Sequence, residues 1–387
     1  MKLAGRDIVC IGFADWQTEL KTNQHHLMSR LARENKVLFV ESLGLRQPQL
    51  SSRDLKRILR RLKRGLAPPR QIDGVHVLSP LVIPFHRFGV VRALNARLLP
   101  WLVRRAARKL GMSSPILWSY NPQAEVLIDV LHPSLVLYHC VDDVAAQKGV
   151  DAASFRAAEA RFAQRADVVL TTSEPLAERL RQITDKVIAM PNVADTDLFS
   201  RALEDGPVDP ALAALPGPRI VFTGAIVATK LDVELLLELA RRRPDWTFAL
   251  VGPIGAGDPS TDVSLLEQEP NLHLLGLRPY DELPAVLRGA DAALIPYALN
   301  ELTASIFPMK VYEYLAAGLP VVATPLPSLQ GVEGVVMAAD ADSTAARLEE
   351  LLAGDTQEAR AERSKLASGH SWDARVDEIA AALNGHG

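Results

Sequence analysis

Cysteine is nearly absent from this sequence, and long apolar runs are absent altogether. Only Cys10 and Cys140 occur in 387 residues, so we expect no disulfide framework, and a reducing compartment fits. The zinc patterns that need more cysteines, or a helical pair of histidines with a glutamate, are missing. No apolar run reaches the roughly 18 residues of a membrane span, and the polar start Met1–Asp7 is unlike a signal peptide. Secreted and membrane-spanning classes are therefore not expected.

Two nucleotide-binding signatures are also missing. The first predicted strand ends in Ile11-Gly12-Phe13-Ala14, which lacks the G-x-G-x-x-G fingerprint. No G-x-x-x-x-G-K-[ST] occurs anywhere in the chain. Dinucleotide-dependent dehydrogenases and P-loop NTPases are thus disfavoured.

Negative charge is scarce in the first part of the chain. The net charge is only −3, yet residues 1–110 hold 22 Lys and Arg against 7 Asp and Glu. In residues 53–70 the cations surround a helical stripe of leucine and isoleucine, and in residues 98–110 they flank Trp101. Such helices bind anionic membrane surfaces, which is the partner we expect. The alternative is that each stripe packs on its own domain. Nucleic acid is not expected, because no aromatic stacking motif accompanies the charges.

Short apolar runs alternate with helical periods, which predicts parallel sheets covered by helices. The predicted strands are Asp7–Gly12, Val37–Glu41, Pro115–Ser119, Leu135–His139, Val168–Thr172 and Val187–Met190, then Arg219–Thr223, Thr247–Val251, Leu272–Leu275, Ala292–Pro296 and Pro320–Ala323. The predicted helices include Asn23–Arg33, Phe155–Arg165, Val233–Arg243 and Asp281–Arg288. The Pro- and Gly-rich stretch Leu203–Pro218 is typical of a linker. We therefore predict the α/β class, with two Rossmann-like doubly wound domains that face each other across a cleft.

Polar residues follow two strands of the first predicted domain. Lys21, Asn23, Gln24 and His25 open the helix after the first strand, where ligands of open α/β sheets bind. For the adjacent His25 and His26, the alternative is one surface histidine and one packed histidine. Asp142 and Asp143 follow a later strand, where a carboxylate can act as a general base. Asp143 alternatively caps the next turn.

In the second predicted domain, Gly224 ends a strand and Lys230 follows in a loop, which is a plausible phosphate contact. In the segment Ser305–Val322, Pro308 suits the first position of a helix and Gly318 its end. Lys310 and Glu313 then share one helical face. They form either a surface ion pair or a site for a diphosphate and a ribose.

These residues resemble a known family. Pro308-x-Lys310-x-x-Glu313-Tyr-Leu-Ala-x-Gly318-x-Pro320 is similar to the donor-site helix of GT-B glycosyltransferases, most closely family 4 of group 1. Pro191-Asn192-Val-Ala-Asp195 resembles the family's segment near the domain junction, and His370-Ser371-Trp372 the start of its closing helix. The donor helix also resembles that of bacterial exopolysaccharide glycosyltransferases, which invert and use an aspartate base. The resemblance covers most of residues 135–387.

The resemblance implies a division of labour along the chain. Residues 1–200 would form the acceptor-binding domain, residues 201–369 the nucleotide-sugar domain, and residues 370–387 a helix that crosses back. Lys21, Asn23, Gln24 and His25 would contact the acceptor, and Asp142 would be the base of an inverting reaction. The donor would lie against Gly224, Lys230, Tyr280, Ser305, Phe307, Lys310 and Glu313. No metal or other cofactor is expected, because Lys230, Lys310 and a helix N-terminus would stabilise the departing diphosphate.

Two positions depart from family 4. Ser305 stands where the first glutamate of the family's E-x7-E pair is expected, and Ala225 stands where an arginine is usual. Whether the reaction inverts or retains stays open. We expect a cytoplasmic, peripherally membrane-associated glycosyltransferase that acts on a lipid-linked or saccharide acceptor in polysaccharide synthesis. A GT-B nucleotide-sugar epimerase and a non-catalytic partner subunit remain alternatives.

Overall fold

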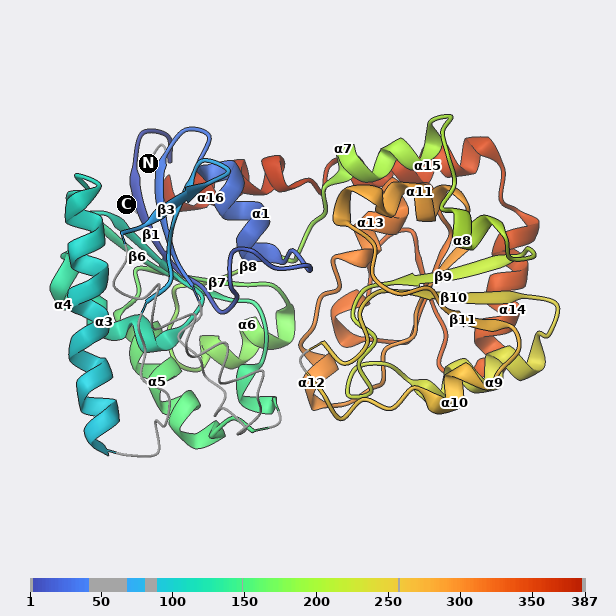
Figure 1. Cartoon of the computed structure of the whole chain (residues 1–387), viewed down its shortest axis with the longest axis horizontal. Helices are drawn as coiled ribbons and strands as arrows, with labels where there is room; N and C mark the ends of the chain where they lie inside the picture. The colour runs from blue at the N-terminus through green and yellow to red at the C-terminus, as the bar shows by residue number, and fades with distance from the viewer. Residues whose placement is uncertain (1–2, 42–67, 81–88, 148, 257, 385–387) are drawn as a thin grey trace. The chain divides into compact units, whose positions relative to one another are not determined.

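A computed structural model describes residues 3–41, 68–80, 89–147, 149–256 and 258–384 of the chain. The chain divides into two compact units. The first comprises Met1–Pro191 together with Val376–Gly387, and the second comprises Asn192–Arg375. Each is built on its own β-sheet (Figure 1). Most of the first basic segment, residues 53–67, lies outside the described residues.

The sheet of the first unit has the strand order β3-β4-β2-β1-β5-β6-β7-β8. All of its pairings are parallel except that of β3 with β4. The strands are β1 (Asp7–Ile11), β2 (Lys36–Val40), β3 (Arg70–Ile72), β4 (Val75–Leu78), β5 (Ile116–Ser119), β6 (Leu135–Cys140), β7 (Val168–Thr171) and β8 (Val187–Ala189). The inner strands are apolar on both faces, as expected where helices cover a parallel sheet.

The helices of the first unit connect these strands. They are α1 (Asn23–Leu31), α3 (Gly89–Lys109), α4 (Glu125–Leu131), α5 (Ala152–Arg165) and α6 (Glu174–Arg181). The helices α3, α4 and α5 lie side by side. None of the described helices of the chain combines the length and the hydropathy needed to cross a membrane.

The sheet of the second unit is parallel throughout, with the order β11-β10-β9-β12-β13-β14. Its strands are β9 (Arg219–Thr223), β10 (Thr247–Val251), β11 (Leu272–Leu274), β12 (Ala292–Ile295), β13 (Val321–Ala323) and β14 (Val335–Met337). Its helices are α7 (Thr196–Phe199), α8 (Pro210–Ala213), α9 (Val233–Arg242), α10 (Ser264–Glu267), α11 (Leu283–Arg288), α12 (Glu301–Ala304), α13 (Lys310–Ala316), α14 (Ala341–Ala353) and α15 (Gln357–Ser368). Helix α16 (Trp372–Asn384) begins in this unit and ends in the first one.

The predicted fold class, α/β with two doubly wound sheets, is confirmed, and the predicted strands are present within two residues at either end. The short strands β3, β4 and β14 were not predicted. The proposed linker, Leu203–Pro218, is wrong, because this segment belongs to the second unit. The Arg288 guanidinium holds it there by donating hydrogen bonds to the carbonyl oxygens of Arg201, Glu204 and Pro207.

Candidate functional site

The strand order of the second unit places a topological switch point between β9 and β12. From β9 the chain proceeds to β10 and β11 on one side, and then to β12, β13 and β14 on the other. Ligands of open α/β sheets bind outside the carboxyl ends of the strands at such a point, where neighbouring loops diverge. Gly224 directly follows β9 and Tyr297 follows β12, so both belong to this edge of the sheet.

The Lys310 side chain lies against Gly224. A Cβ atom at position 224 would be 2.4 Å from Lys310 Cε and 2.6 Å from Nζ, and φ of Gly224 is +134°. The ammonium also lies 5.6 Å from the centre of the Phe222 ring. Two predicted site residues, 86 positions apart in the chain, are thus brought together. The backbone angle favours glycine at this position, and any larger residue would also have to displace the end of the Lys310 side chain.

The Glu313 carboxyl group is buried one turn along the same helix, with 5% of the residue exposed. Burial raises the pKa of Glu313, although Lys310 and the Tyr280 hydroxyl group act to lower it. Burial also disfavours the Lys310 ammonium, but Tyr297 and Glu313 outweigh that effect and raise the pKa of Lys310. The site therefore combines a lysine whose charged form is favoured with a glutamate whose charged form is disfavoured by burial.

Helix α13 begins later than predicted. The sequence placed Pro308 at its first position, but the helix starts at Lys310, so Lys310 and Glu313 both lie in the first turn. The Phe307 carbonyl oxygen accepts a hydrogen bond of 2.9 Å from the Asn192 side chain, which holds the preceding segment outside the helix. Its predicted end is confirmed, because Gly318 has a positive φ of 77° directly after the last turn.

Two tyrosines that the sequence analysis did not select as site residues, Tyr312 and Tyr314, hold α13 in place. The Tyr314 hydroxyl group accepts a hydrogen bond of 2.8 Å from the Thr223 amide at the end of β9. The Tyr312 ring stacks on His370 at 4.1 Å and on Phe307 at 5.8 Å between ring centres. The Pro191-Asn192 motif singled out Asn192, which bonds to Phe307. No local sequence pattern could have identified Thr223 as the partner of the buried Tyr314.

The remaining predicted donor residues lie in loops around the same edge. The Lys230 carbonyl oxygen accepts a 2.8 Å hydrogen bond from the Ala298 amide, which ties the loop after β9 to the loop after β12. Ser305 is buried at the end of α12, and Phe307 is buried in the stack described above. Tyr280 lies two residues after Arg278. The Arg278 guanidinium pairs with the Asp209 carboxylate at 2.6 Å and so holds the segment that carries Tyr280.

In the first unit, three of the four predicted acceptor residues are buried and make internal hydrogen bonds. The Tyr120 hydroxyl group donates to Asn23 Oδ1 at 2.9 Å, and Gln24 Oε1 accepts from the Phe13 amide at 3.0 Å. His25 Nε2 lies 3.1 Å from the carbonyl oxygen of Asp15. These contacts hold the loop after β1, and Lys21 is exposed beside it. Acceptor binding by these residues stays a prediction.

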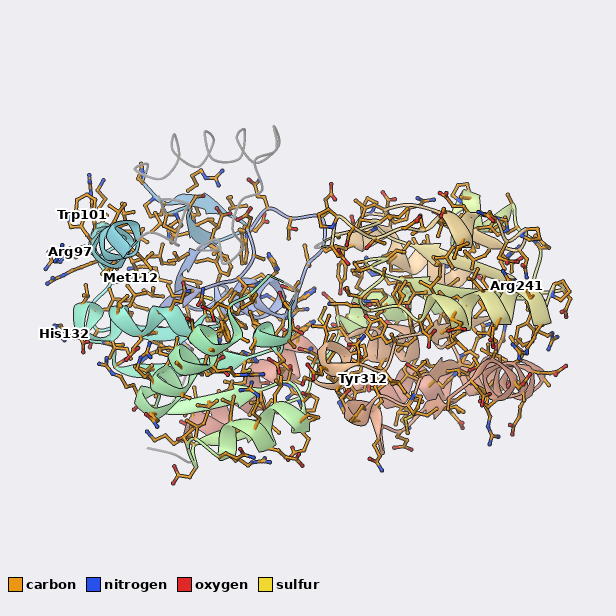
Figure 2. The ribbon with its side chains drawn as sticks, turned by 90° about the horizontal axis from the view of Figure 1, so that it is seen from below. Arg97, Trp101, Met112, His132, Arg241 and Tyr312 are labelled. Atoms are coloured by element: carbon orange, nitrogen blue, oxygen red, sulfur yellow. The ribbon has the colours of Figure 1, made fainter. Side chains whose placement is uncertain are left out.

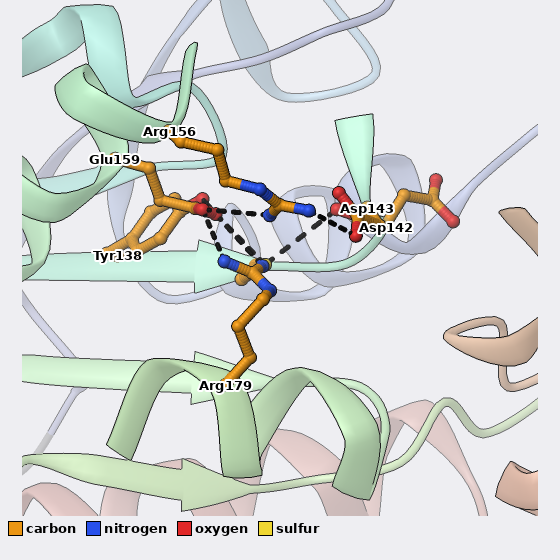
Figure 3. Close-up of polar contacts among 7 residues, drawn as sticks. Tyr138, Asp142, Asp143, Arg156, Glu159 and Arg179 are labelled. Carbon is orange, nitrogen blue, oxygen red and sulfur yellow. Dashed lines mark hydrogen bonds and ion pairs between the residues drawn. The ribbon is translucent and has the colours of Figure 1, made fainter. Parts of the chain in front are cut away.

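The predicted base, Asp142, is partly buried in the loop after β6. One interpretation of the sequence was that its neighbour Asp143 caps the following turn. In the structure the Asp143 side chain makes no such capping hydrogen bond. The Asp143 carboxylate is paired instead with Arg156 at 2.5 Å, within the polar cluster of Figure 3. No group of three or more His, Cys, Asp or Glu side chains suited to a metal ion occurs in the described part of the chain.

Comparison with known proteins identifies relatives of this chain. Residues 217–354 match the family described as glycosyl transferases group 1. A putative teichuronic acid biosynthesis glycosyltransferase, TuaH of Bacillus subtilis (strain 168), is 33% identical over 226 residues. That alignment covers 55% of this chain and 56% of the relative, so the chain spans little more than half the length of the curated relative it matches.

Solved structures resemble the whole chain. Sucrose-phosphate synthase from Thermosynechococcus elongatus has a TM-score of 0.68 at 15% identity, with 98% of both chains covered. Anabaena HepE in complex with UDP and glucose has a TM-score of 0.67 at 15% identity, with 98% of this chain and 99% of the other covered. Trehalose 6-phosphate synthase from Burkholderia multivorans has a TM-score of 0.68 at 12% identity, with coverages of 99% and 98%. At these identities the likeness establishes the fold.

The contact between Gly224 and Lys310 predicts a measurable coupling. Gly224→Ala combines a backbone angle unfavourable to L-residues with a clash against the lysine, and we expect a loss of about 1–3 kcal/mol in unfolding free energy. In a Lys310→Ala background the loss is expected to be smaller, because the clash is gone. Denaturant unfolding of the two single variants and the double variant measures both values. Equal losses in the two backgrounds would rule out the lysine as the constraint.

The raised pKa of Glu313 predicts a pH-dependent effect on stability. The folded protein binds this proton more tightly than the unfolded chain does, so stability falls as pH rises from the ordinary carboxyl range through the raised pKa. We expect Glu313→Gln to be more stable than the wild type at neutral pH, with a difference that shrinks towards acidic pH. Unfolding measured across pH tests this, with the exposed Glu301→Gln as control. A variant no more stable than the wild type at neutral pH contradicts it.

Proposed function

We propose that this chain, which has the GT-B fold and matches group 1 glycosyl transferases over residues 217–354, transfers a sugar from a nucleoside diphosphate sugar to an acceptor. The observation that carries the proposal is that the half-buried Lys310 lies against Gly224 at the switch point of the matched domain, with the buried Glu313 three residues along the same helix. Its support also includes HepE, a protein of the same fold that was solved with UDP and glucose.

We assign the donor to the second unit. Negative charge develops on the diphosphate as the sugar departs, and the Lys310 ammonium is charged and already held in place to stabilise it. Lys230 would supply a second cation. Glu313 would accept hydrogen bonds from the two ribose hydroxyl groups, and Tyr280, Ser305 and Phe307 would shape the surrounding pocket. Two lysines would take the place of a metal ion in this scheme, so we propose a metal-independent reaction.

Asp142 would accept the proton of the acceptor hydroxyl group in an inverting reaction. An aspartate carboxyl group in water has a pKa of about 4, so the enzyme must raise the pKa of Asp142 or compensate by geometry. In a retaining reaction the departing diphosphate would take the proton, and Asp142 would only bind the acceptor. Lys21, Asn23, Gln24 and His25 are the residues we propose to shape the acceptor side.

We further propose that helix α3 binds an anionic membrane. Leu102, Val103 and Ala106 face the core, whereas the opposite face carries an exposed tryptophan among cations. This basic face consists of Arg97, Trp101, Arg104, Arg105, Arg108 and Lys109. Figure 2, which looks nearly along α3, shows Arg97 and Trp101 on the side of the helix turned away from the sheet.

The chemistry of the basic face fits a lipid surface. Arg105 lies 5.4 Å from the centre of the Trp101 ring, so an aromatic side chain suited to the headgroup region is surrounded by positive charge. Cations near an anionic membrane contribute about 1 kcal/mol each. A peripheral location at the inner face of the cell membrane would bring the enzyme to a lipid-linked saccharide acceptor, consistent with a relative named for teichuronic acid biosynthesis.

Nucleotide-sugar binding is tested by thermal unfolding with UDP-, GDP-, dTDP- and ADP-sugars. One nucleotide class is expected to stabilise the protein, by about 2.7 kcal/mol at a hundred times its Kd. Lys310→Ala and Glu313→Ala are expected to abolish the shift, and Lys365→Ala, an exposed lysine on α15, to leave it unchanged.

The outcomes separate the candidate functions. Absence of a shift with every sugar, in folded protein, contradicts the donor site. Binding without transfer to any acceptor supports a non-catalytic subunit, and conversion of the nucleotide sugar without an acceptor supports an epimerase.

Membrane binding is tested by flotation with vesicles of phosphatidylglycerol and phosphatidylcholine, against phosphatidylcholine alone. The wild type is expected to bind only the anionic vesicles, and the Arg104→Gln/Arg108→Gln variant about tenfold or more weakly, since two cations are lost. The matched control is Arg241→Gln/Arg347→Gln, which removes two exposed arginines of the second unit. Equal binding by both double variants would exclude the basic face as the contact.

A further inference from the structure

The loop after β6, Val141–Asp143, is held at each of its residues. The Val141 carbonyl oxygen accepts a 2.8 Å hydrogen bond from the Thr172 hydroxyl group. The Asp142 carbonyl oxygen accepts one of 3.1 Å from the Val144 amide and a weaker one of 3.8 Å from the Cys140 thiol, whose pKa is raised by burial. The Asp143 carboxylate is paired with Arg156. The backbone of Asp142 is therefore held in place by these contacts of Val141, of Asp143 and of its own carbonyl oxygen.

A second carboxylate stands behind this loop. Glu159 on α5 is 1% exposed and accepts hydrogen bonds from the Tyr138 hydroxyl group at 2.8 Å and from Arg179 at 2.5 Å. Arg156 joins the two carboxylates, because its Nη1 donates to Glu159 at 3.3 Å and its Nη2 donates to Asp143 at 2.5 Å. Two guanidinium groups thus balance two carboxylates, as a buried charge requires.

The contacts of Asp143 depend strongly on this bridge. Its Oδ2 is paired with Arg156, whereas Oδ1 is buried and has no hydrogen-bond partner among the described residues. Figure 3 shows the Asp142 carboxylate on the far side of Asp143, pointing away from the cluster. The cluster therefore binds the neighbour of Asp142 and leaves the Asp142 carboxylate directed elsewhere.

We propose that Arg156, anchored on buried Glu159, is a positioning residue that fixes the loop of Asp142 for the transfer reaction. The functional part of this inference rests on the role proposed above for Asp142. Arg156 touches neither donor nor acceptor in this scheme. It acts through Asp143 on the place and direction of the Asp142 carboxylate, where a displacement of about 1 Å lowers turnover about a hundredfold.

The bridge between Glu159 and Asp143 depends on the planar guanidinium group of Arg156. Two different nitrogens of Arg156 reach two carboxylates on different elements, whereas a lysine ammonium carries its three donors on one nitrogen and cannot span both positions in the same way. Arg156→Lys therefore keeps the charge and loses the bridge. Arg161→Lys is the matched control: the same substitution on the same helix, at an arginine that pairs with Glu125 on the exposed surface.

The first measurement is steady-state transfer by the full chain with the nucleotide sugar that the thermal panel identifies. For Arg156→Lys we expect kcat about 10- to 100-fold lower, KM for the donor within about twofold, and an unchanged thermal shift by the donor. Arg161→Lys is expected to match the wild type in all three. Arg156→Lys with normal kcat, or with kcat and donor binding lost together, overturns the proposal.

A double-variant cycle separates positioning from a general structural role. If Arg156 acts through Asp142, Arg156→Lys has no further effect on the residual kcat of Asp142→Asn. A further loss as large as that in the wild-type background shows that Arg156 serves something else, and contradicts the proposal.

The second measurement does not depend on activity. Amide hydrogen exchange over residues 141–147 reports the hydrogen bonds of the Val144 and Ala146 amides to the carbonyl oxygens of Asp142 and Asp143. We expect exchange there to be about tenfold faster in Arg156→Lys and unchanged in Arg161→Lys. Unchanged exchange in both overturns the positioning role whatever the activity. Faster exchange in a protein that transfers no sugar leaves the loop assignment intact and refutes the proposed function.

Discussion

The second unit depends on the close approach of the Lys310 side chain to the end of β9. Glycine at position 224 leaves room for the end of the Lys310 side chain and adopts a φ that L-residues rarely adopt, and the Tyr314 hydroxyl group accepts a hydrogen bond from the adjoining Thr223 amide. Helix α13 is therefore fixed to the switch point at two successive residues of the strand end. The direction of Glu313, one turn along, follows from that docking, and so does the electrostatic character of the whole edge of the sheet.

The sequence was most informative where one short segment carries several constraints. Alternating apolar runs located the inner strands within two residues, and the segment from Pro308 to Pro320 identified Lys310, Glu313 and Gly318 together. The strands β3, β4 and β14 were not predicted; β3 and β14 lie at the edges of their sheets, where their residues are only partly buried or exposed. The start of α13 was misplaced because the decisive hydrogen bond comes from Asn192, more than a hundred residues earlier.

The first unit shows a different limit of sequence reasoning. Asn23, Gln24 and His25 were selected for their polarity, yet the structure buries them against Tyr120, Phe13 and Asp15, none of which any spacing rule connects with them. Glu159 and Arg156 were not selected at all. In the sequence they form an ordinary pair of opposite charges three residues apart on one helix. Glu159 is buried and bonded only because Tyr138 of β6 and Arg179 of α6 contact it in the folded protein.

The division of α16 between the units has a consequence for biosynthesis. The first unit is assembled from residues 1–191 and from the last turns of α16, where Ile379 and Leu383 are buried. The second unit, in contrast, is one continuous stretch. On the ribosome, where domains generally fold as they emerge, the sheet of the first unit forms early but lacks its final helix until the second unit has been synthesised. Completion of the amino-terminal unit thus waits for synthesis of the second unit, although its strands are made before those of the second unit.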